Sequence, residues 1–527
     1  MLVGCAQTPR EAGVLRVAQE SDASTLDPAK AYDTTSIKFA RVLYRGLVDF
    51  DQNARVIPEL ATRWTISPDG KTYTFQIRDG VRFHGGEKLS SRDFRFAIER
   101  MLDPKTASDG TSFFTNIVGA KDWIADKEKP LAQQKLQNIA GIECPDDSTL
   151  VFRLEKPEAT FLANLALPFA YAVPREYVRA LDKEGKTLSQ NPNGTGPFRL
   201  KEWVHDGWLT LVKNPDYYRA GVPKLERVET QFGVGSTLQI MLLEQGNLDV
   251  QDITSAFPPD FLRLRDKEPW KSRIEHAPMM DFRYIAMNNE IAPFNDKRVR
   301  RAVNFAINRE RIAGFLTGRV TLAKGVLPPG MPGFNPQLRG FSYNPQRAKQ
   351  LLREAGFSPN KTQIPMLYPT TEPWYAKAAQ SVQADLKAVG IAVDIVPLRF
   401  GDLRAKAGTR GPNGARLSFN GWLQDYPDPS NFFDPLFSSR SIKKTASLNR
   451  SFYQNPTVDT LLETALRETN QAKRHELYRA AEKQIVEDAP VVFLHHSENY
   501  VVRQPWVEGP VLHPMWSAVY EQLAVTE

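Results

Sequence analysis

The segment that most constrains the fold of this chain lies at 365–398, where a strand, a helix and a second strand are predicted in succession. PMLY leads into WYAKAAQSVQADLKAV, which has apolar residues at helical spacing and is followed by Gly390, a residue type that often ends a helix. IAVDIVPL at 391–398 then alternates as a strand does. This spacing is typical of a parallel crossover unit, because parallel strands need a long connection. We therefore expect an α/β fold for the C-terminal half.

Other patterns predict further strands and helices. VLRVAQ at 14–19 and the alternating residues 72–77 are predicted strands, and the second is expected to be half-buried and antiparallel. Helices are predicted at 90–102, after a serine cap, and at 344–356, between an asparagine cap and a glycine stop. The apolar run at 161–174 contains an asparagine and two prolines, so we expect buried core there rather than a membrane helix.

Length and charge limit the class of protein. A chain of 527 residues, 41% of them hydrophobic, exceeds what one core supports, so two or three domains are expected. The net charge of +7 is mildly basic, and the runs KRVRR at 297–301 and RERI at 309–312 have helical spacing. We predict that these runs form solvated helix faces and that the protein does not bind nucleic acid, which usually requires clustered basic and aromatic residues.

The two cysteines, Cys5 and Cys144, suggest a lipid anchor rather than a disulfide. Leu2, Val3 and Gly4 before Cys5 match the small-residue pattern of a bacterial lipoprotein cleavage site, although the basic and apolar parts of a signal peptide are missing. A chance match is the alternative. We expect residues 1–11 to be a truncated lipoprotein signal and tether with Cys5 lipidated, which leaves Cys144 without a partner.

Two runs of turn formers and aromatic residues are too unusual to follow from periodicity alone: GWLQDYPDPSNFF at 421–433 and NPNGTGPFRL at 191–200. Both resemble segments of the bacterial extracellular solute-binding proteins of the oligopeptide- and dipeptide-binding family (family 5), which serve ABC importers. The resemblance continues in family order along almost the whole chain, through STLDPA (24–29), LYRGLVDFD (43–51), IPELATRWTISPDGKTYTFQIRDGVRFHGG (57–86), NPDYY (214–218), PFNDKRVRRAVNFAINRE (293–310), YNPQRAKQLLREAGF (343–357) and EKQIVEDAPVVFLHH (482–496).

The resemblance implies a large two-lobed α/β clamp, similar to type II periplasmic binding proteins, with an extra subdomain in the first lobe. Ligand in a cleft between the lobes would favour the closed state. The implied segments are 12–50, 187–277 and 493–527 for lobe I, 51–186 for the extra subdomain and 278–492 for lobe II.

The resemblance also implies a function without catalysis. The protein is expected to capture di- to oligopeptides and to deliver them to the membrane permease of an ABC importer. We expect a monomer without cofactor or metal, in the periplasm or on the outer face of the cytoplasmic membrane and held there by lipid. Members of the family also bind nickel chelates, haem, opines or oligosaccharides, so a non-peptide ligand is the alternative. A role in sensing rather than in transport also stays open.

Asp425 is the main site residue that the resemblance implies. It matches the family position whose carboxylate pairs with the α-ammonium of a peptide. The alternative is a turn aspartate before Tyr426 and Pro427 that accepts hydrogen bonds from nearby backbone amides. The residue that would receive the ligand's carboxylate cannot be placed from the sequence.

Further site residues are predicted near Asp425 and near the N-terminus. Gly421 and Trp422 lie on a strand expected to line the cleft, where a ligand can pair with main-chain groups. The ring of Trp422 is predicted either to line the bottom of a ligand pocket or to pack in the hydrophobic core. The loop residues Ala31, Tyr32 and Asp33 are expected to line the cleft as well, whereas Asn193 and Gly194 are better explained by a tight turn. Leu423 stands where some members carry a half-cystine.

A hydrolase is the main alternative from another class of protein. His84, His495 and His496 are conceivable catalytic residues, but no Gly-x-Ser-x-Gly motif is present. Adjacent histidines on a strand point to opposite faces, so His495 and His496 are poorly placed to chelate one metal ion. His84 is predicted to be a surface or hydrogen-bonded turn residue.

Overall fold

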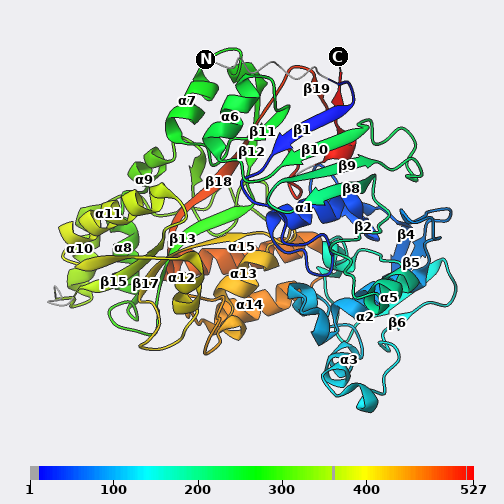
Figure 1. Ribbon diagram of the computed structural model, residues 1–527. Coiled ribbons are helices and arrows are strands. Elements are labelled where there is room, and N and C mark those ends of the chain that lie inside the picture. The colour runs from blue at the N-terminus through cyan, green and yellow to red at the C-terminus, as the bar shows by residue number, and fades with distance from the viewer. Residues whose placement is uncertain (1–10, 359–362, 518, 527) are drawn as a thin grey trace. The chain divides into compact units, whose positions relative to one another are not determined.

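The computed structural model describes residues 11–358, 363–517 and 519–526, and its chain divides into two compact units (Figure 1). Unit 1 comprises Met1–His276 and Tyr500–Glu527, and unit 2 comprises Ala277–Asn499. The chain therefore passes from one unit to the other twice. The predicted lipidation of Cys5 lies outside the described residues. The finer division into lobe I, extra subdomain and lobe II stays a prediction.

Unit 1 contains two four-stranded sheets. The first has the order β1-β10-β9-β8, in which β1 (Val14–Ala18) lies parallel to β10 (Arg227–Gln231) and the other pairs are antiparallel. Leu15 and Val17 of β1 share an apolar core with Phe39 and Leu43 of α1 (Thr34–Leu43), so this helix covers one face of the sheet. The predicted strand at 14–19 is thus confirmed.

The second sheet of unit 1 has the order β4-β5-β7-β6. Its central strand β5 (Thr72–Ile77) alternates half-buried and buried residues and pairs antiparallel on both sides, as the sequence predicts. Helix α2 (Ser91–Met101) begins after Ser90, which forms a reciprocal capping box with Asp93. The apolar run at 161–174 is almost entirely buried core, also as predicted.

The remaining elements of unit 1 are short. They are β2 (Val48–Phe50), β3 (Val56–Pro58), β4 (Ala61–Ile66), α3 (Ala120–Lys127), β6 (Ile142–Glu143), β7 (Thr149–Arg153), α4 (Phe161–Asn164), α5 (Arg175–Lys183), β8 (Phe198–Val204), β9 (Trp208–Lys213), α6 (Ser236–Glu244), β11 (Val250–Asp252), α7 (Pro258–Asp266), β19 (Val507–Glu508) and β20 (Ala524–Val525), with β12 (Ile274–Pro278) at the boundary with unit 2.

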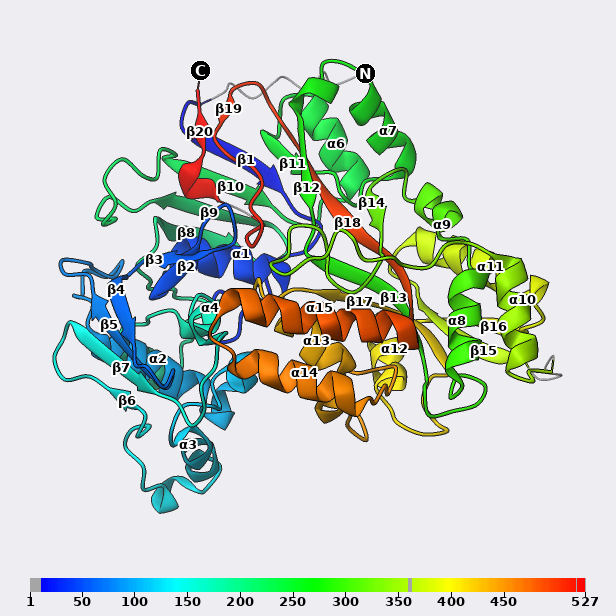
Figure 2. The same cartoon turned by 180° about the vertical axis from the view of Figure 1, so that it is seen from behind.

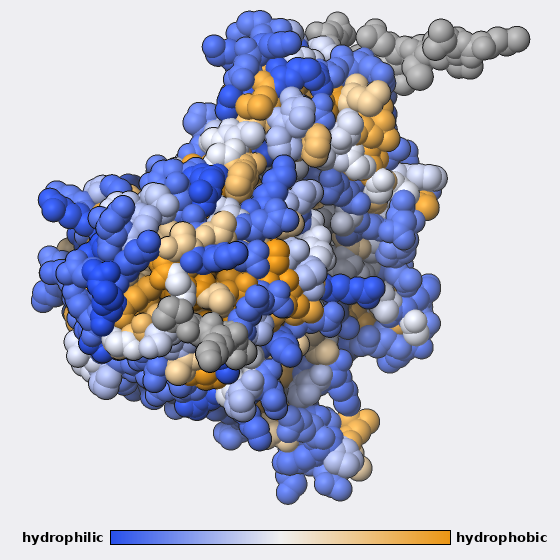
Figure 3. Space-filling view, turned by 90° about the vertical axis from the view of Figure 1, so that its left-hand side faces the viewer, coloured by the Kyte–Doolittle hydropathy of each residue, from blue (hydrophilic) through white to orange (hydrophobic). Residues whose placement is uncertain are grey.

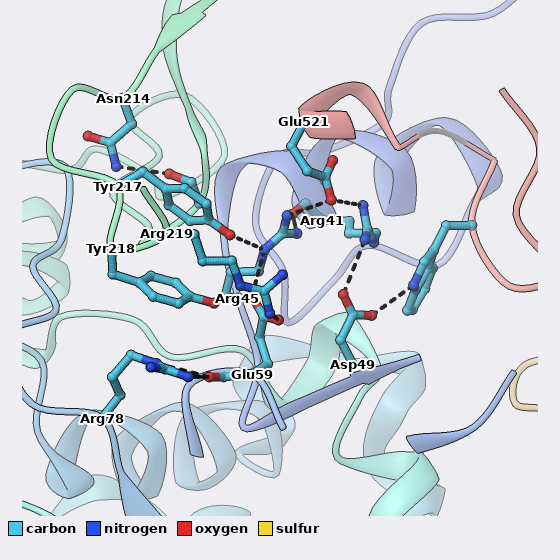
Figure 4. A network of polar contacts seen from close by, with 12 residues as sticks. Arg41, Arg45, Asp49, Glu59, Arg78, Asn214, Tyr217, Tyr218, Arg219 and Glu521 are labelled. Atoms are coloured by element: carbon cyan, nitrogen blue, oxygen red, sulfur yellow. Dashed lines mark hydrogen bonds and ion pairs between the residues drawn. The ribbon is translucent and has the colours of Figure 1, made fainter. Parts of the chain in front are cut away.

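A buried network of charged groups ties the C-terminal segment of unit 1 to α1 (Figure 4). Arg45 Nη2 lies 2.8 Å from Glu521 Oε1, and Arg45 Nε lies 3.1 Å from Glu59 Oε1. Arg41 pairs with Glu521 at 2.9 Å and with Asp49 at 3.1 Å. Burial opposes a charged Glu521, but the two guanidinium groups outweigh burial and lower its pKa to about 2. The network is therefore a set of compensated charges inside the core.

Unit 2 is built on the sheet order β18-β13-β17-β15-β16, and β14 (Val320–Leu322) also pairs with β18. The long strand β18 (Val491–Arg503) continues into unit 1, where its last residues pair with β11. Strand β13 (Asp281–Met287) lies antiparallel to both β18 and β17 (Leu417–Leu423).

The crossover predicted at 365–398 is confirmed in unit 2. Strand β15 (Ile364–Pro369) leads into α11 (Pro373–Ala388), and β16 (Val393–Leu398) then pairs parallel to β15. Gly390 follows the helix with φ of +94°, a conformation that a residue without a side chain adopts at little cost. The predicted helix at 344–356 is α10 (Pro345–Glu354), with Asn344 as its cap.

Helices cover both faces of the unit 2 sheet. Ile285 and Met287 of β13 pack with α8, α10 and α11, whereas Phe282 and Tyr284 face α13 and the pair α14 and α15, which lie side by side (Figure 2). Cover on both faces is typical of sheets that contain parallel strands, as this one does at β15, β16 and β17. The helices not yet given bounds are α8 (Lys297–Ala306), α9 (Arg309–Phe315), α12 (Phe400–Ala407), α13 (Ser430–Phe437), α14 (Pro456–Arg467) and α15 (Gln471–Asp488).

The prediction that 297–301 and 309–312 form solvated helix faces is wrong for two arginines. Arg300 and Arg309 are buried. The Arg300 guanidinium donates to the carbonyls of Phe294 and Asp488, and Arg309 donates to those of Ala323 and Phe493. The two guanidinium groups therefore donate to backbone carbonyls inside the core, where a charged side chain needs such acceptors.

Figure 3 shows one face of the molecule, on which apolar patches lie between larger hydrophilic areas. In the described parts of the chain, no helix is both long enough and apolar enough to cross a membrane. Cys144 is a half-buried free thiol.

Candidate ligand-binding site

The predicted residues of unit 2 lie at one edge of its sheet. Strands β15 and β17 are parallel, so their carboxyl ends meet at the same edge, where α11 also begins. Strand β13 starts there as well, because Asp281 pairs with Leu423 at the end of β17. In open α/β sheets ligands bind outside the carboxyl ends of the strands, which makes this edge the candidate site.

Asn431 holds Asp425 in place just beyond β17. The Asn431 Oδ1 atom accepts hydrogen bonds from the Asp425 backbone N–H and from the Trp422 indole N–H, each at 3.0 Å. Its Nδ2 group donates to Asp425 Oδ2 at 3.1 Å. Asn431 is buried in α13, whereas Asp425 is half-buried. The carboxylate of Asp425 is thus oriented while part of the residue stays accessible.

A second aspartate in the same loop has a structural partner. Arg474 Nη2 donates to Asp428 Oδ1 at 2.8 Å. Arg474 is buried and lies near the start of α15. The Asp428 carboxylate also accepts from the Ser430 backbone N–H at 2.8 Å. Burial raises the pKa of the Tyr426 hydroxyl, which therefore stays protonated inside the loop. The loop that carries Asp425 is consequently fixed at both ends.

Trp422 and Gly421 face opposite sides of the sheet. The half-buried ring of Trp422 packs on the cluster that includes Phe282 and Tyr284. Gly421 pairs with Arg283, and a Cβ atom on Gly421 would lie only 2.6 Å from Arg283 Nη1. The absence of a side chain therefore leaves the space that the guanidinium occupies. Any ligand contact of Gly421 or Trp422 remains a prediction.

Arg283 is a charged residue at this edge that the sequence reasoning missed, although an arginine inside the apolar strand DFRYIAM was the available signal. Its Nε donates to Asp281 Oδ2 at 2.8 Å, and Nη1 lies 3.4 Å from the Tyr375 hydroxyl. Burial opposes the charge on Arg283, but the carboxylate of Asp281 outweighs burial and raises its pKa. The guanidinium therefore stays positively charged.

The adjacent histidines of β18 lie among core residues. The ring of His495 contacts that of Trp374, whereas His496 Nδ1 lies 2.7 Å from the Asp281 carbonyl and its ring lies near Phe282. Burial lowers the pKa of His495 to about 3, so the ring is neutral. Within the described residues, no group of histidine, cysteine, aspartate and glutamate side chains could hold a metal ion.

The other predicted ligand residues, Ala31, Tyr32 and Asp33, belong to unit 1. Asp33 caps α1, because its carboxylate accepts from the Ser36 backbone N–H at 2.8 Å. Ala31 is fully buried, and the exposed ring of Tyr32 contacts Phe169. Their contribution to a ligand site remains a prediction.

His84 and its neighbour Gly85 form hydrogen bonds with Asn193 and Gly194. His84 Nδ1 accepts from the Gly194 backbone N–H at 3.3 Å, and Asn193 accepts from the Gly85 N–H at 2.9 Å. Gly194 permits a close approach to the backbone, because a Cβ atom there would lie 2.0 Å from the Leu43 carbonyl oxygen. The prediction of a hydrogen-bonded His84 is confirmed, whereas a tight turn at Asn193 and Gly194 stays a prediction.

Comparisons with known proteins identify relatives over nearly the full length. Di/tripeptide-binding protein 2 of Pseudomonas aeruginosa is 31% identical over 523 residues, which cover 95% of this chain and 93% of that protein. Heme-binding protein A of Haemophilus influenzae is 31% identical over 502 residues, which cover 92% of this chain and 88% of that protein.

A solved structure supports the fold. The periplasmic binding protein DppA of Helicobacter pylori, solved in complex with the peptide STSA, aligns with 98% of each chain at a TM-score of 0.76 and 28% identity. The predicted two-lobed α/β fold class is thereby confirmed. The pattern of the family described as "Bacterial extracellular solute-binding proteins, family 5 Middle" matches residues 55–444. This chain therefore belongs to the bacterial extracellular solute-binding proteins of family 5.

Proposed function

We propose that this protein is the extracytoplasmic substrate-binding protein of an ABC importer and that it binds peptides, with Asp425 receiving the peptide's amino terminus. The observation that carries the proposal is the carboxylate of Asp425, which Asn431 orients at the edge of the sheet where strand ends converge. The names of relatives that bind di- and tripeptides, and of a structural neighbour solved with a peptide, support the choice of ligand.

The physical argument is one of preorganisation. An ammonium group and a carboxylate attract each other more strongly when bound ligand displaces the water around them. Because the hydrogen bonds to Asn431 already hold Asp425, the ligand does not have to order this residue on binding. A peptide amino terminus gains a charged partner at a fixed position.

The proposal includes partners and a location. The bound peptide is delivered to the permease subunits of the importer, and a monomeric protein acts in the periplasm or on the outer face of the cytoplasmic membrane. Lipidation at Cys5 holds it at that membrane. Metabolic labelling with a fatty-acid analogue, compared between the wild type and Cys5→Ser in the full precursor, tests the anchor.

A non-peptide ligand is the second candidate, because one relative is named for binding heme. Native mass spectrometry of freshly purified protein, followed by mild unfolding, distinguishes the two. Released masses that sequence as short peptides support the proposal. A released haem or metal chelate contradicts it.

The role of Asp425 is tested with Asp425→Asn, which keeps an acceptor for Asn431 and removes the charge. We expect peptide binding to weaken by about 2–5 kcal/mol, because the ligand's ammonium loses its counter-charge in a site that excludes water. Isothermal titration calorimetry with trialanine measures the change. The exposed Asp402→Asn on α12 is the matched control and should bind as the wild type does. Equal affinities of Asp425→Asn and the wild type would remove Asp425 from the site.

A further inference from the structure

Arg283 has an arrangement that is unusual for a core arginine. Its neighbours in β13, Phe282 and Tyr284, are buried, yet 30% of its side chain is exposed. Asp281 occupies the Nε side of the guanidinium, and the contact from Nη1 to the Tyr375 hydroxyl is long at 3.4 Å. Nη2 makes no hydrogen bond to any part of the chain that the structure describes. The Nη1–Nη2 edge is thus available for an acceptor.

Asp281 orients Arg283 and does not depend on it. The buried carboxylate of Asp281 also accepts from the Ser497 backbone N–H at 2.6 Å and from the Ser497 hydroxyl at 2.8 Å. These two hydrogen bonds remain when Arg283 is replaced. Glu372 lies near enough to act on Arg283 electrostatically, but its Oε2 accepts from the Trp374 indole N–H at 3.2 Å. Among the described residues, Asp281 holds the guanidinium in place, and no hydrogen bond or ion pair joins it to Glu372.

The position of Gly421 relates Arg283 to Asp425. The Arg283 guanidinium lies against Gly421, and Asp425 follows four residues later. Since an extended chain spans at most about 3.6 Å per residue, the Cα atoms of Gly421 and Asp425 are separated by no more than about 14 Å. A bound peptide that advances about 3.3 Å per residue covers a distance of up to about 14 Å with no more than about four residues.

We propose that Arg283 binds the ligand's carboxylate through its Nη1–Nη2 edge, so that the ligand is a short peptide zwitterion of no more than about four residues. The proposal rests on the proposed function, because it takes Asp425 as the partner of the amino terminus. Arginine suits this role, since its planar fork matches the two oxygens of a carboxylate and stays charged. Gly421 has no side chain, which leaves room for the Arg283 guanidinium.

The test compares one peptide with and without its carboxylate. Trialanine and trialanine amide are titrated calorimetrically into the wild type, Arg283→Gln and Gly421→Ala. We expect the wild type to bind trialanine at least about 30-fold more tightly than trialanine amide. Arg283→Gln should lose this preference, because it weakens the binding of trialanine and leaves the binding of the amide unchanged. Gly421→Ala keeps the charge but moves the guanidinium, and it should also reduce the discrimination.

A control variant and the dependence of binding on Asp425 make the outcomes separable. Arg410→Gln removes an exposed, ion-paired arginine of unit 2 and should leave both affinities unchanged. If the wild type binds no short peptide, the proposed function fails. If the wild type binds trialanine and Asp425→Asn weakens this binding, the proposed function stands. If Arg283→Gln and Gly421→Ala then keep the wild-type preference for the acid over the amide, the role of Arg283 is refuted. Should Arg283→Gln fail to fold, the Gly421→Ala result alone decides.

Discussion

Replacing Arg45 by methionine should destabilise unit 1 more than any exposed arginine does. The side chain of Arg45 is 2% exposed and pairs with Glu59 and Glu521, which are 1% and 7% exposed. Removing one partner of a buried ion pair usually costs about 3–5 kcal/mol, because the other charge stays buried without compensation. Here Glu59 keeps Arg219, and Glu521 keeps Arg41. We therefore expect a loss at the lower end, about 3 kcal/mol.

Urea unfolding followed by far-ultraviolet circular dichroism and tryptophan fluorescence measures this loss for Arg45→Met. The matched control is Arg153→Met in the same unit, where both partners of the ion pair with Glu143 are about half exposed and the cost should stay below about 1 kcal/mol. Adding Glu521→Gln to Arg45→Met removes the excess negative charge and should recover part of the stability. A loss no greater than in the Arg153 control would refute the reasoning.

Two further predictions concern buried carboxyl and glycine positions. Burial raises the pKa of Glu482 from 4.5 to about 7, although the backbone N–H groups of Leu327 and Val326 oppose the shift. The stability from the raised pKa is present below pH 4.5 and lost as the pH rises through 7, so the wild type should lose about 3 kcal/mol relative to Glu482→Gln between pH 4.5 and pH 8. Melting curves of both proteins at the two pH values test this, and parallel pH profiles would contradict it. Gly194→Ala should cost about 1–3 kcal/mol by overpacking against the Leu43 carbonyl. Gly401→Ala, inside α12 with open space around it, should cost nothing. Equal melting temperatures for the two variants would show that the close approach at Gly194 relaxes freely.

The sequence by itself determined the local elements and the family. The sequence predicts the strand at 72–77, the helix capped by Asn344 and the crossover at 365–398. Each prediction uses apolar spacing and capping residues that lie close together in the chain. The family followed from motifs in order along the chain, and these also singled out Asp425. Such signals are readable because each depends on neighbours in sequence.

Tertiary structure alone decided which polar side chains are buried and what they hold. Asp281, which orients Arg283, meets Ser497 across 216 residues, and Arg45 meets Glu521 across 476 residues. The sequence predicts that Arg300 belongs to a solvated helix face. In the structure it is buried and donates to the carbonyl of Asp488, which lies 188 residues further on at the end of α15. Spacing within one helix or strand cannot reveal such partners, because burial of a charge depends on which distant group compensates it.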